Sequence, residues 1–178
     1  SIYCYFEVSD VLITQVTTPV YFGGNPMILI EYYLENRDDV SHSVGVLLFL
    51  DTMIDSSDNA PIATEYGYSH IGQEYVYPEI PGYWQAFEHS PFQPDSLLIG
   101  EGILMGGDAI CPDRFVYGDF GRYSGVFWDY TVYEEEYYDS SVLLRWDAAL
   151  LPPGETRSVA TYYGLGSAET VPGEIRLS

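Results

Sequence analysis

The chain has 178 residues, of which 47% are hydrophobic and 16% aromatic, and tyrosine alone occurs 18 times. Its 27 acidic residues face six arginines and no lysine, giving a net charge of −21. Such a polyanion repels phosphate backbones and anionic lipid headgroups, so nucleic acid and membranes are not expected as partners. No apolar run reaches the ~18 residues of a membrane-spanning helix.

The length suits one domain with a sizeable core, predicted to span residues 1–178. The chain begins at Ser1 with neither an initiator methionine nor an apolar leader. We therefore expect a leader to have been removed and the protein to act at the cell surface or outside the cell.

Alternating apolar positions, which are typical of strands, recur along most of the chain. The first predicted strand, residues 1–8, places Ile2, Cys4, Phe6 and Val8 on one face. Further strands are predicted at residues 11–17, 28–36, 42–50, 83–89, 96–105, 113–120, 126–132, 141–150, 156–165 and 173–178. About ten strands joined by turns and long ordered loops predict an all-β fold, an antiparallel Ig-like or jelly-roll sandwich.

Two of these segments carry additional information. Residues 42–50 are apolar on both faces, so this strand is expected to be central or to be covered by loops. Residues 152–154, Pro-Pro-Gly, form a turn between two strands, because proline presets φ and glycine tolerates a positive φ.

The cysteines, Cys4 and Cys111, show no CxxC spacing of the kind used for zinc or redox chemistry. An even number of cysteines in a chain expected outside the cell predicts a disulfide between them. The alternative is a pair of buried free thiols.

Three aspartates, Asp51, Asp55 and Asp58, follow the apolar strand at residues 42–50. They do not form an EF-hand loop, because Ser56 and Ile62 stand at its sixth and twelfth positions in place of Gly and Glu. A structured turn is the first interpretation, since Asp and Ser side chains bond to their own backbone. A looser calcium site is the alternative.

A second acidic cluster contains Glu134, Glu136 and Asp139. On a strand, the two glutamates would point to the same side and could share a calcium ion, whereas a solvated, charge-protected edge is the alternative. Calcium is the only cofactor for which the sequence indicates candidate ligands.

Catalytic machinery is not evident in the sequence. With 27 carboxylates, any pair at the separation that glycosidases use carries little information. The three histidines are isolated and no GxSxG motif is present, so no zinc or nucleophile site is predicted. We therefore expect a protein that is not an enzyme.

Aromatic residues crowd the first predicted strand and the turn-rich middle of the chain. Such side chains stack on sugar rings or form protein interfaces, because they combine a wide apolar body with a polar tip. The candidates are Tyr3, Tyr5, Tyr66, Tyr68, Tyr75, Tyr77, Tyr83 and Trp84.

Several stretches resemble an uncharacterised family of secreted and cell-surface β-sandwich domains of bacteria and archaea. They are SHSVGVLLFLDTMIDSSDNAPI, PGYWQAFEHSP, PDRFVYGDF, FWDYTV and SSVLLRWDAALLPPGETRSVATYYGLG, in this order between roughly residues 26 and 166. The resemblance implies an extracellular β-sandwich and transfers no catalytic residue.

These observations favour a non-enzymatic extracellular structural protein, a self-assembling subunit of a filament or surface layer. Its predicted partner is a second copy of itself, which pairs with residues 1–8 or residues 173–178 while tyrosines fill the interface. A carbohydrate-binding module that uses the loop aromatics is the alternative, and a glycoside hydrolase is the third hypothesis.

Overall fold

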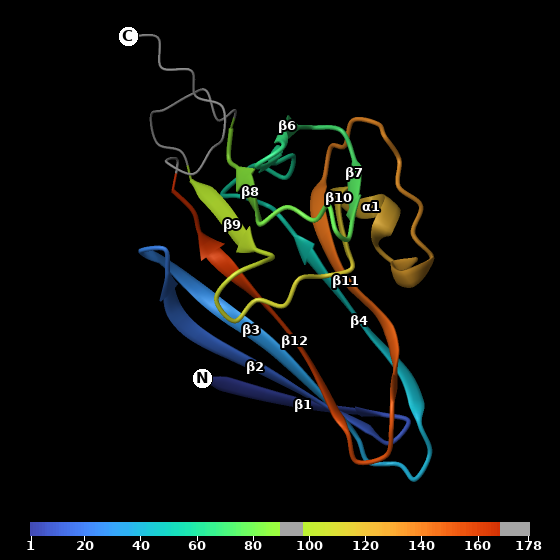
Figure 1. The fold of residues 1–178 in the computed structure, drawn as a ribbon. Helices are drawn as coiled ribbons and strands as arrows, with labels where there is room; N and C mark the ends of the chain where they lie inside the picture. Colours follow the sequence, from blue (N-terminus) through green and yellow to red (C-terminus); the bar gives the residue numbers. More distant parts are fainter. Residues whose placement is uncertain (90–97, 168–178) are drawn as a thin grey trace.

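The structure, a computed structural model, describes residues 1–89 and 98–167, and it consists almost entirely of strands (Figure 1). The predicted strand at residues 173–178 lies outside the described residues. In chain order the elements are β1 (Ile2–Val8), β2 (Val11–Phe22), β3 (Asn25–Asn36), β4 (His42–Asp51), β5 (Ile62–Thr64), β6 (Gly67–Ser69), β7 (Gln73–Val76), β8 (Tyr83–Phe87), β9 (Ile99–Ile103), β10 (Arg114–Asp119), α1 (Phe120–Tyr123), the 3₁₀ helix η1 (Phe127–Asp129), β11 (Ser140–Leu151) and β12 (Thr156–Leu165).

The strands form two antiparallel sheets that pack face to face. The eight-stranded sheet has the order β1-β2-β3-β12-β9-β8-β5-β6, and the four-stranded sheet has the order β4-β11-β10-β7. This arrangement confirms the predicted all-β sandwich. The described residues contain twelve strands rather than about ten, because the turn-rich middle of the chain adds short strands that its composition does not reveal.

Tight turns set the register of the longest strands. Ser9 and Asp10 join β1 to β2 with φ angles of 50° and 59°, a left-handed pair that matches the twist of a two-residue hairpin. Gly154, with φ of 74°, closes the predicted Pro-Pro-Gly turn between β11 and β12. These turns give β1 an unbroken ladder on β2 and bring β12 alongside β3.

The main core lies between the two sheets, in the part of the molecule where β8, β9 and β10 are found (upper half of Figure 1). Trp84 is 1% exposed and stacks on Tyr163 with ring centroids 5.5 Å apart. Tyr137 is also buried, and its hydroxyl donates to the carbonyl oxygen of Ser69 at 2.9 Å. A tyrosine-rich core is therefore satisfied by internal hydrogen bonds as well as by apolar contact.

In this upper half, both outer faces of the sandwich are also covered. The segment after β9 covers Met27 and Leu29 of the large sheet, with Ala109 packed against the same cluster. On the small sheet, Phe49 of β4 stacks on Phe120 of α1 with centroids 5.0 Å apart. The upper half thus has four layers, two of which are loops or short helices.

One local prediction is wrong in this region, and another is met by only one of its two alternatives. Residues 126–132 form η1 and irregular backbone rather than a strand, because Phe127 adopts a φ of 44° that no strand allows. β4 is apolar on both faces, but it is the outer strand of its sheet and not a central one. Its second apolar face is covered by α1 and η1, which agrees with the other half of that prediction.

Within the part of the chain that the structure describes, none of the helices has the length and apolar character needed to cross a membrane.

Candidate functional site

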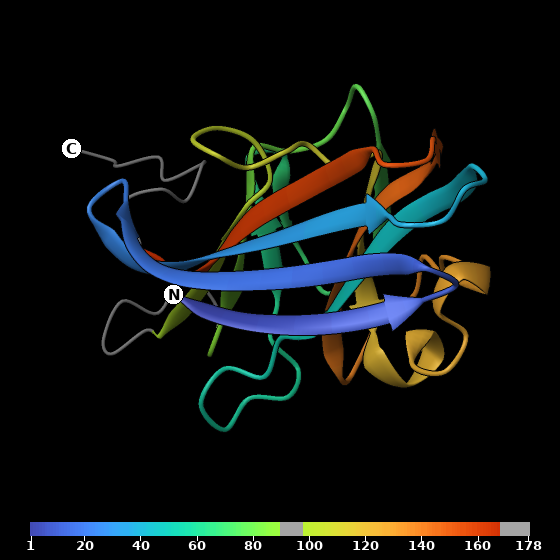
Figure 2. The same cartoon turned by 90° about the horizontal axis from the view of Figure 1, so that it is seen from below.

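The most unusual surface of the molecule is β1, the outer strand of the eight-stranded sheet. Figure 2 shows it as the outermost member of the row β1, β2 and β3. All seven of its residues are exposed, including Tyr5 at 66% and Phe6 at 53%. Apolar side chains therefore stand on both faces of a strand whose second edge pairs with no described strand.

The cross-strand register explains which face each side chain takes. Cys4 lies opposite Gln15 and Tyr32, and Phe6 lies opposite Ile13 and Leu34. Leu34 is 2% exposed in the core, so the row predicted on one face of β1 is an extension of the inner face of the sheet. The tyrosines, Tyr3 and Tyr5, alternate with this row and stand on the outer face.

The inner row of β1, which is Ile2, Cys4, Phe6 and Val8, extends beyond the small sheet. In the cluster that joins the two sheets at this end, β4 packs through Val44 and Val46 against residues of β2 and β3. No residue of β1 belongs to a core cluster. The small sheet therefore does not extend far enough to cover β1, and this leaves a step at the edge of the sandwich.

A groove of about 470 Å³ runs along this step between the two sheets. Its lining comes from the end of β1, β2 and β3 on one side and from the first residues of β4 and from β11 on the other, with Trp128 beside them. The lining residues are Val8, Ser9, Val11, Ile13, Leu34, His42, Ser43, Val44, Gly45, Trp128 and Ala148. Arg145 lies over the Trp128 ring, with its guanidinium carbon 4.9 Å from the centroid. No sequence pattern indicates this groove, because it depends on which strands end the two sheets.

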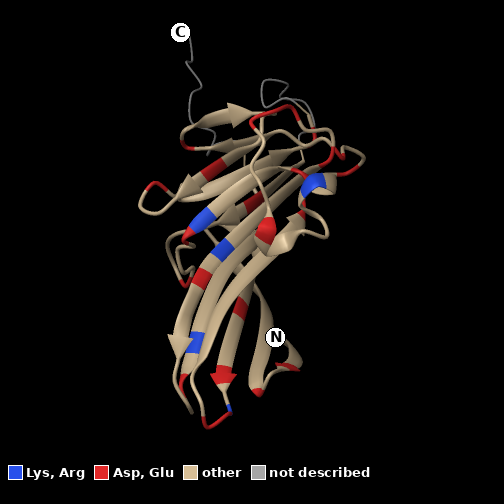
Figure 3. Cartoon of the chain, turned by 90° about the vertical axis from the view of Figure 1, so that its right-hand side faces the viewer, with Lys and Arg blue, Asp and Glu red and all other residues tan. Residues whose placement is uncertain are grey.

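Charge is almost absent from this side. Within β1 the one charged residue is Glu7, and β4 carries no charge between Ser43 and Leu50. The acidic residues, red in Figure 3, gather largely in loops and at strand ends. Like-charge repulsion between two copies is therefore weakest where β1 and β4 are exposed.

The disulfide predicted between Cys4 and Cys111 is wrong, since both cysteines are free. Cys4 is exposed on the overhanging strand, whereas Cys111 packs against the main core and its Sγ lies 3.4 Å from the carbonyl oxygen of Pro112. Burial raises the pKa of the Cys111 thiol, and Asp113 raises it further. Cysteine count could not reveal that the two residues belong to different parts of the sandwich.

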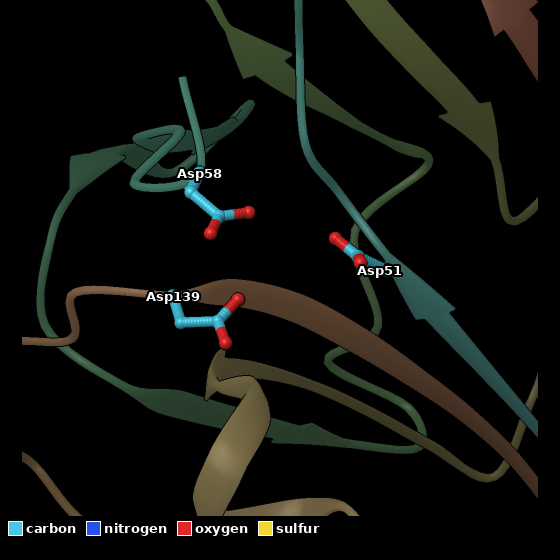
Figure 4. Close-up of side chains that lie close together, drawn as sticks. All are labelled: Asp51, Asp58 and Asp139. Atoms are coloured by element: carbon cyan, nitrogen blue, oxygen red, sulfur yellow. The ribbon is translucent and has the colours of Figure 1, made fainter. Parts of the chain in front are cut away.

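Three carboxylates converge near the opposite end of β4, drawn from both of the predicted acidic clusters (Figure 4). Candidate ligand atoms of Asp51, Asp58 and Asp139 all lie within 4.8 Å of one another. Calcium is bound by six to eight oxygens at 2.3–2.6 Å, so three carboxylates at this spacing could supply part of a coordination shell. Asp51 and Asp58 are exposed, and Asp139 is half-buried.

The local fold explains this convergence. Asp51 ends β4 opposite Ser141, which places it close to the start of β11. The backbone N–H of Ser140 donates to the Asp58 carbonyl oxygen at 2.7 Å, which ties the loop after β4 to the same point. Burial raises the pKa of Asp139, and the charges of Asp58 and Asp51 raise it further.

The other predicted metal ligands do not join this group. Asp55 is exposed in a tight turn with φ of 54°. Glu134 and Glu136 are exposed and belong to no strand, although Glu136 forms an isolated antiparallel bridge with Ile71, so the continuous strand assumed for them is not present. Sequence separation had divided the acidic residues into two clusters, and tertiary pairing selects one or two members from each.

The predicted aromatic candidates also divide into groups. Tyr3, Tyr5, Tyr66 and Tyr77 are exposed, whereas Tyr68, Tyr75 and Tyr83 are half-buried and Trp84 is in the core. The rings of Tyr66 and Tyr75 lie 5.6 Å apart with an interplanar angle of 33°. With Glu79 they line a shallow hollow of about 340 Å³.

Comparison of the sequence with protein-family models gives no match, and comparison with curated proteins gives none either.

Proposed function

We propose that this chain is a non-enzymatic structural protein of the cell surface or extracellular space, and that copies of it assemble through the exposed edge of β1 into a filament or surface layer. The observation that carries this proposal is a seven-residue strand that is exposed on both faces and along one edge. An added strand would satisfy the free backbone groups and cover the apolar side chains at the same time.

The edges of the two sheets differ in how they are protected. Natural sheets protect their edges with short strands, charged side chains, prolines or bulges. β6 has three residues and β7 has four, which fits this rule. β1 has seven residues, no proline and an unbroken register on β2, and Glu7 is its one charged residue, so it is protected far less than β6 and β7.

The net charge of the chain agrees with assembly at a defined surface. A charge of −21 keeps copies apart in most orientations. At physiological ionic strength the Debye length is about 8 Å, so short-range contacts decide the outcome where charges are sparse. The β1 side is such a surface, and this selects one mode of association over random aggregation.

The test compares the mass of assemblies in solution by light scattering and their form by electron microscopy. The intact chain should form assemblies, and Tyr5→Lys should leave a folded monomer, because a lysine on an edge strand opposes strand addition. Tyr21→Lys is the matched control, since Tyr21 is 82% exposed on β2 and lies outside the proposed contact. An intact chain that stays monomeric at high concentration, or a Tyr5→Lys variant that assembles normally, would contradict the proposal.

Carbohydrate binding is the second candidate, favoured by the Tyr66–Tyr75 pair and Glu79. Two aromatic rings beside a carboxylate offer a stacking surface and a hydrogen-bond acceptor for a sugar. A glycan array should then give hits that Tyr66→Ala removes and Tyr21→Ala retains. Identical glycan-binding profiles for these two variants would contradict carbohydrate binding at this hollow.

The three aspartates that converge at the end of β4 form the candidate site for calcium. We propose that an ion held by Asp51, Asp58 and Asp139 would fasten the loop after β4 to the start of β11, supporting the fold rather than supplying chemistry. The effect on thermal stability is the measurement, and its sign is worked out in the Discussion.

A further inference from the structure

We infer that the strand added to β1 is formed by residues 173–178 of a neighbouring copy, so that each copy donates this segment to one neighbour and accepts the segment of another on β1. This rests on the proposed function and names the partner segment through which it operates. Residues 173–178 lie outside the described residues. The pairing is supported by the open edge of β1, by the position of Ser167 at the end of the described chain and by the sequence of the segment.

An open-ended assembly requires two different surfaces in each copy. If β1 paired with β1 of a second copy, the contact would be its own complement and would close into a dimer. A contact between β1 and a different part of the neighbour repeats from copy to copy, so it can build a filament or a layer. The partner of β1 is therefore a segment other than β1.

The other unpaired edges among the described strands are poor partners for seven residues. They belong to β6, β7 and β4. β6 has three residues and β7 has four, so each would cover only part of β1. β4 is longer, but it packs against β2 and β3 on one face and is covered by α1 and η1 on the other. A strand that belongs to no sheet can pair with β1 without bringing a second folded layer with it.

Residues 173–178, Gly-Glu-Ile-Arg-Leu-Ser, have the pattern of such a strand. Ile175 and Leu177 alternate with polar residues, and the Pro-Gly pair at the start of the segment favours a turn before it. On an added strand, the two apolar residues would extend the inner row of β1, to which Phe6 and Val8 belong. The polar residues would then lie on the outer face, beside the tyrosines of β1.

Charge favours the same pairing. Each arginine among the described residues is engaged within its own copy, by an ion pair or by hydrogen bonds to carbonyl oxygens: Arg37, Arg114, Arg122, Arg145 and Arg157. The remaining arginine, Arg176, lies in the segment, and Glu7 is the one charged residue of β1. Placing Arg176 opposite Glu7 sets the two apolar residues of the segment opposite two members of the inner row, whichever way the added strand runs. Opposite charges and apolar contacts are thus satisfied in one register.

The segment begins too far away to reach β1 of its own copy. The described chain ends at Ser167, whose carbonyl oxygen accepts a hydrogen bond from Nε2 of Gln85 on β8, and Gly166 donates its N–H to the carbonyl oxygen of Ile99 on β9. In the order of the sheet, β12, β3, β2 and β1 lie between β9 and a strand added to β1. At ~4.8 Å per strand, this is a separation of about 24 Å across the sheet.

The two positions are also offset along the strands. Ile2 at the start of β1 is level with Thr161 of β12, through the pairs that cross β2 and β3. β12 continues for another four residues, which is about 13 Å. From Ser167 to the start of the segment, residues 168–172 allow a reach of at most about 22 Å, which the two offsets together exceed.

The segment can therefore pair only with β1 of a neighbouring copy. β12 ends in the upper half of the molecule, whereas β1 lies in the lower half (Figure 1). The donated segment and the accepting strand thus belong to different regions of each copy, as an open head-to-tail assembly requires.

The experiment mixes two variants of the chain, each with one of the two surfaces impaired. Tyr5→Lys impairs the accepting edge of β1, and Ile175→Asp impairs the donated segment. By native mass spectrometry we expect each variant alone to be a monomer. The equal mixture should form a dimer of one copy of each that does not grow further, because a single intact contact remains. Thr170→Asp, which adds the same charge ahead of the segment, is the matched control and should assemble like the intact chain.

A charge exchange tests the contact at Glu7. Glu7→Arg and Arg176→Glu should each raise the concentration at which assembly begins by roughly three- to tenfold, because like charges then face each other across the ladder. The two changes combined in one chain should restore assembly. Circular dichroism of each variant checks that the fold is retained.

The outcomes separate the two proposals. A mixed dimer, together with recovery in the charge exchange, supports the donated segment. If Ile175→Asp assembles as well as the intact chain, if the mixture stays monomeric while the intact chain assembles, or if the charge exchange gives no recovery, the donated segment is overturned and assembly through β1 remains. If the intact chain itself stays monomeric, both proposals are overturned.

Discussion

The upper and lower halves of the sandwich use the same kind of strand in opposite ways. In the upper half, two sheets are covered by α1, η1 and the segment after β9, and Phe115 is completely buried. In the lower half, the layers are bare and Phe6 stands 53% exposed on β1. Alternating apolar residues therefore predict a strand in both places, but only their neighbours decide whether the side chains stabilise the fold or remain available for a partner.

The largest effect expected from this comparison is at Phe115. Truncation by Phe115→Ala should lower the free energy of unfolding by about 3–5 kcal/mol, since the site is closely packed and a cavity remains. Urea denaturation monitored by tryptophan fluorescence measures it. A loss below ~1 kcal/mol would show that the upper core is not the stabilising half.

The next effect is at Gly102, which faces the ring of Trp84. A Cβ at this position would lie 2.3 Å from the indole Nε1 of Trp84, so Gly102→Ala forces the ring to move and should cost about 1–3 kcal/mol. Gly82→Ala is the matched control, because its Cβ would meet nothing closer than 3.5 Å. Equal melting temperatures for the two variants would contradict the close packing described here.

The acidic triad in the upper half (Figure 1, Figure 4) gives an effect whose sign depends on calcium. The raised pKa of Asp139 means that its ionised form is less favourable in the folded chain than in the unfolded chain. This penalty is complete above the folded pKa and disappears as the pH falls toward the unfolded value of about 3.9. Asp139→Asn should therefore raise the melting temperature at pH 7 in a chelator, and the gain should shrink on acidification.

With calcium the order should reverse, because the ion stabilises only the chain that keeps all three carboxylates. The melting temperature of the intact protein should rise with added calcium, and that of Asp139→Asn should not. Asp55→Asn is the control, since Asp55 lies outside the triad. A calcium response that is the same in all three proteins would remove the triad as the site.

The smallest effect on folding is expected at Phe6, the counterpart of Phe115. Phe6→Ala should change the free energy of unfolding of the monomer by no more than ~0.5 kcal/mol, as exposed positions usually do, while it weakens assembly. Denaturation at low protein concentration and light scattering at high concentration separate these two effects. A large loss of monomer stability would mean that β1 belongs to the folding core.

Sequence patterns predict the features of the fold that depend on residues close together in the chain. Most of the strands within the described residues, the face of β1 that carries Phe6 and the turn at Gly154 follow from alternation and turn chemistry, and they are confirmed. The burial of Trp84, the free state of Cys4 and the position of β4 at an edge depend on which distant strands pair. The composition of a short segment does not indicate which distant strand it will pair with.

The candidate site shows the same division. Exposed tyrosines on the first strand were predicted from their number and spacing, and Tyr5 is among the exposed residues. The acidic triad was missed as a unit, because Asp139 is 81 residues from Asp58 and they meet only when Ser140 bonds to the loop after β4. The groove beside Gly45 was missed for the same reason.

The hairpin that carries β1 has a consequence for the order of events during synthesis. β1 and β2 are adjacent in the chain and joined by the two residues Ser9 and Asp10, and hairpins of this kind close in about 1–10 μs. The partners of β12, by contrast, include a strand more than 100 residues earlier in the chain. β1 can therefore pair with β2 before the later strands have been synthesised. In the proposed assembly, a neighbouring subunit would then contact a strand that already belongs to its own sheet.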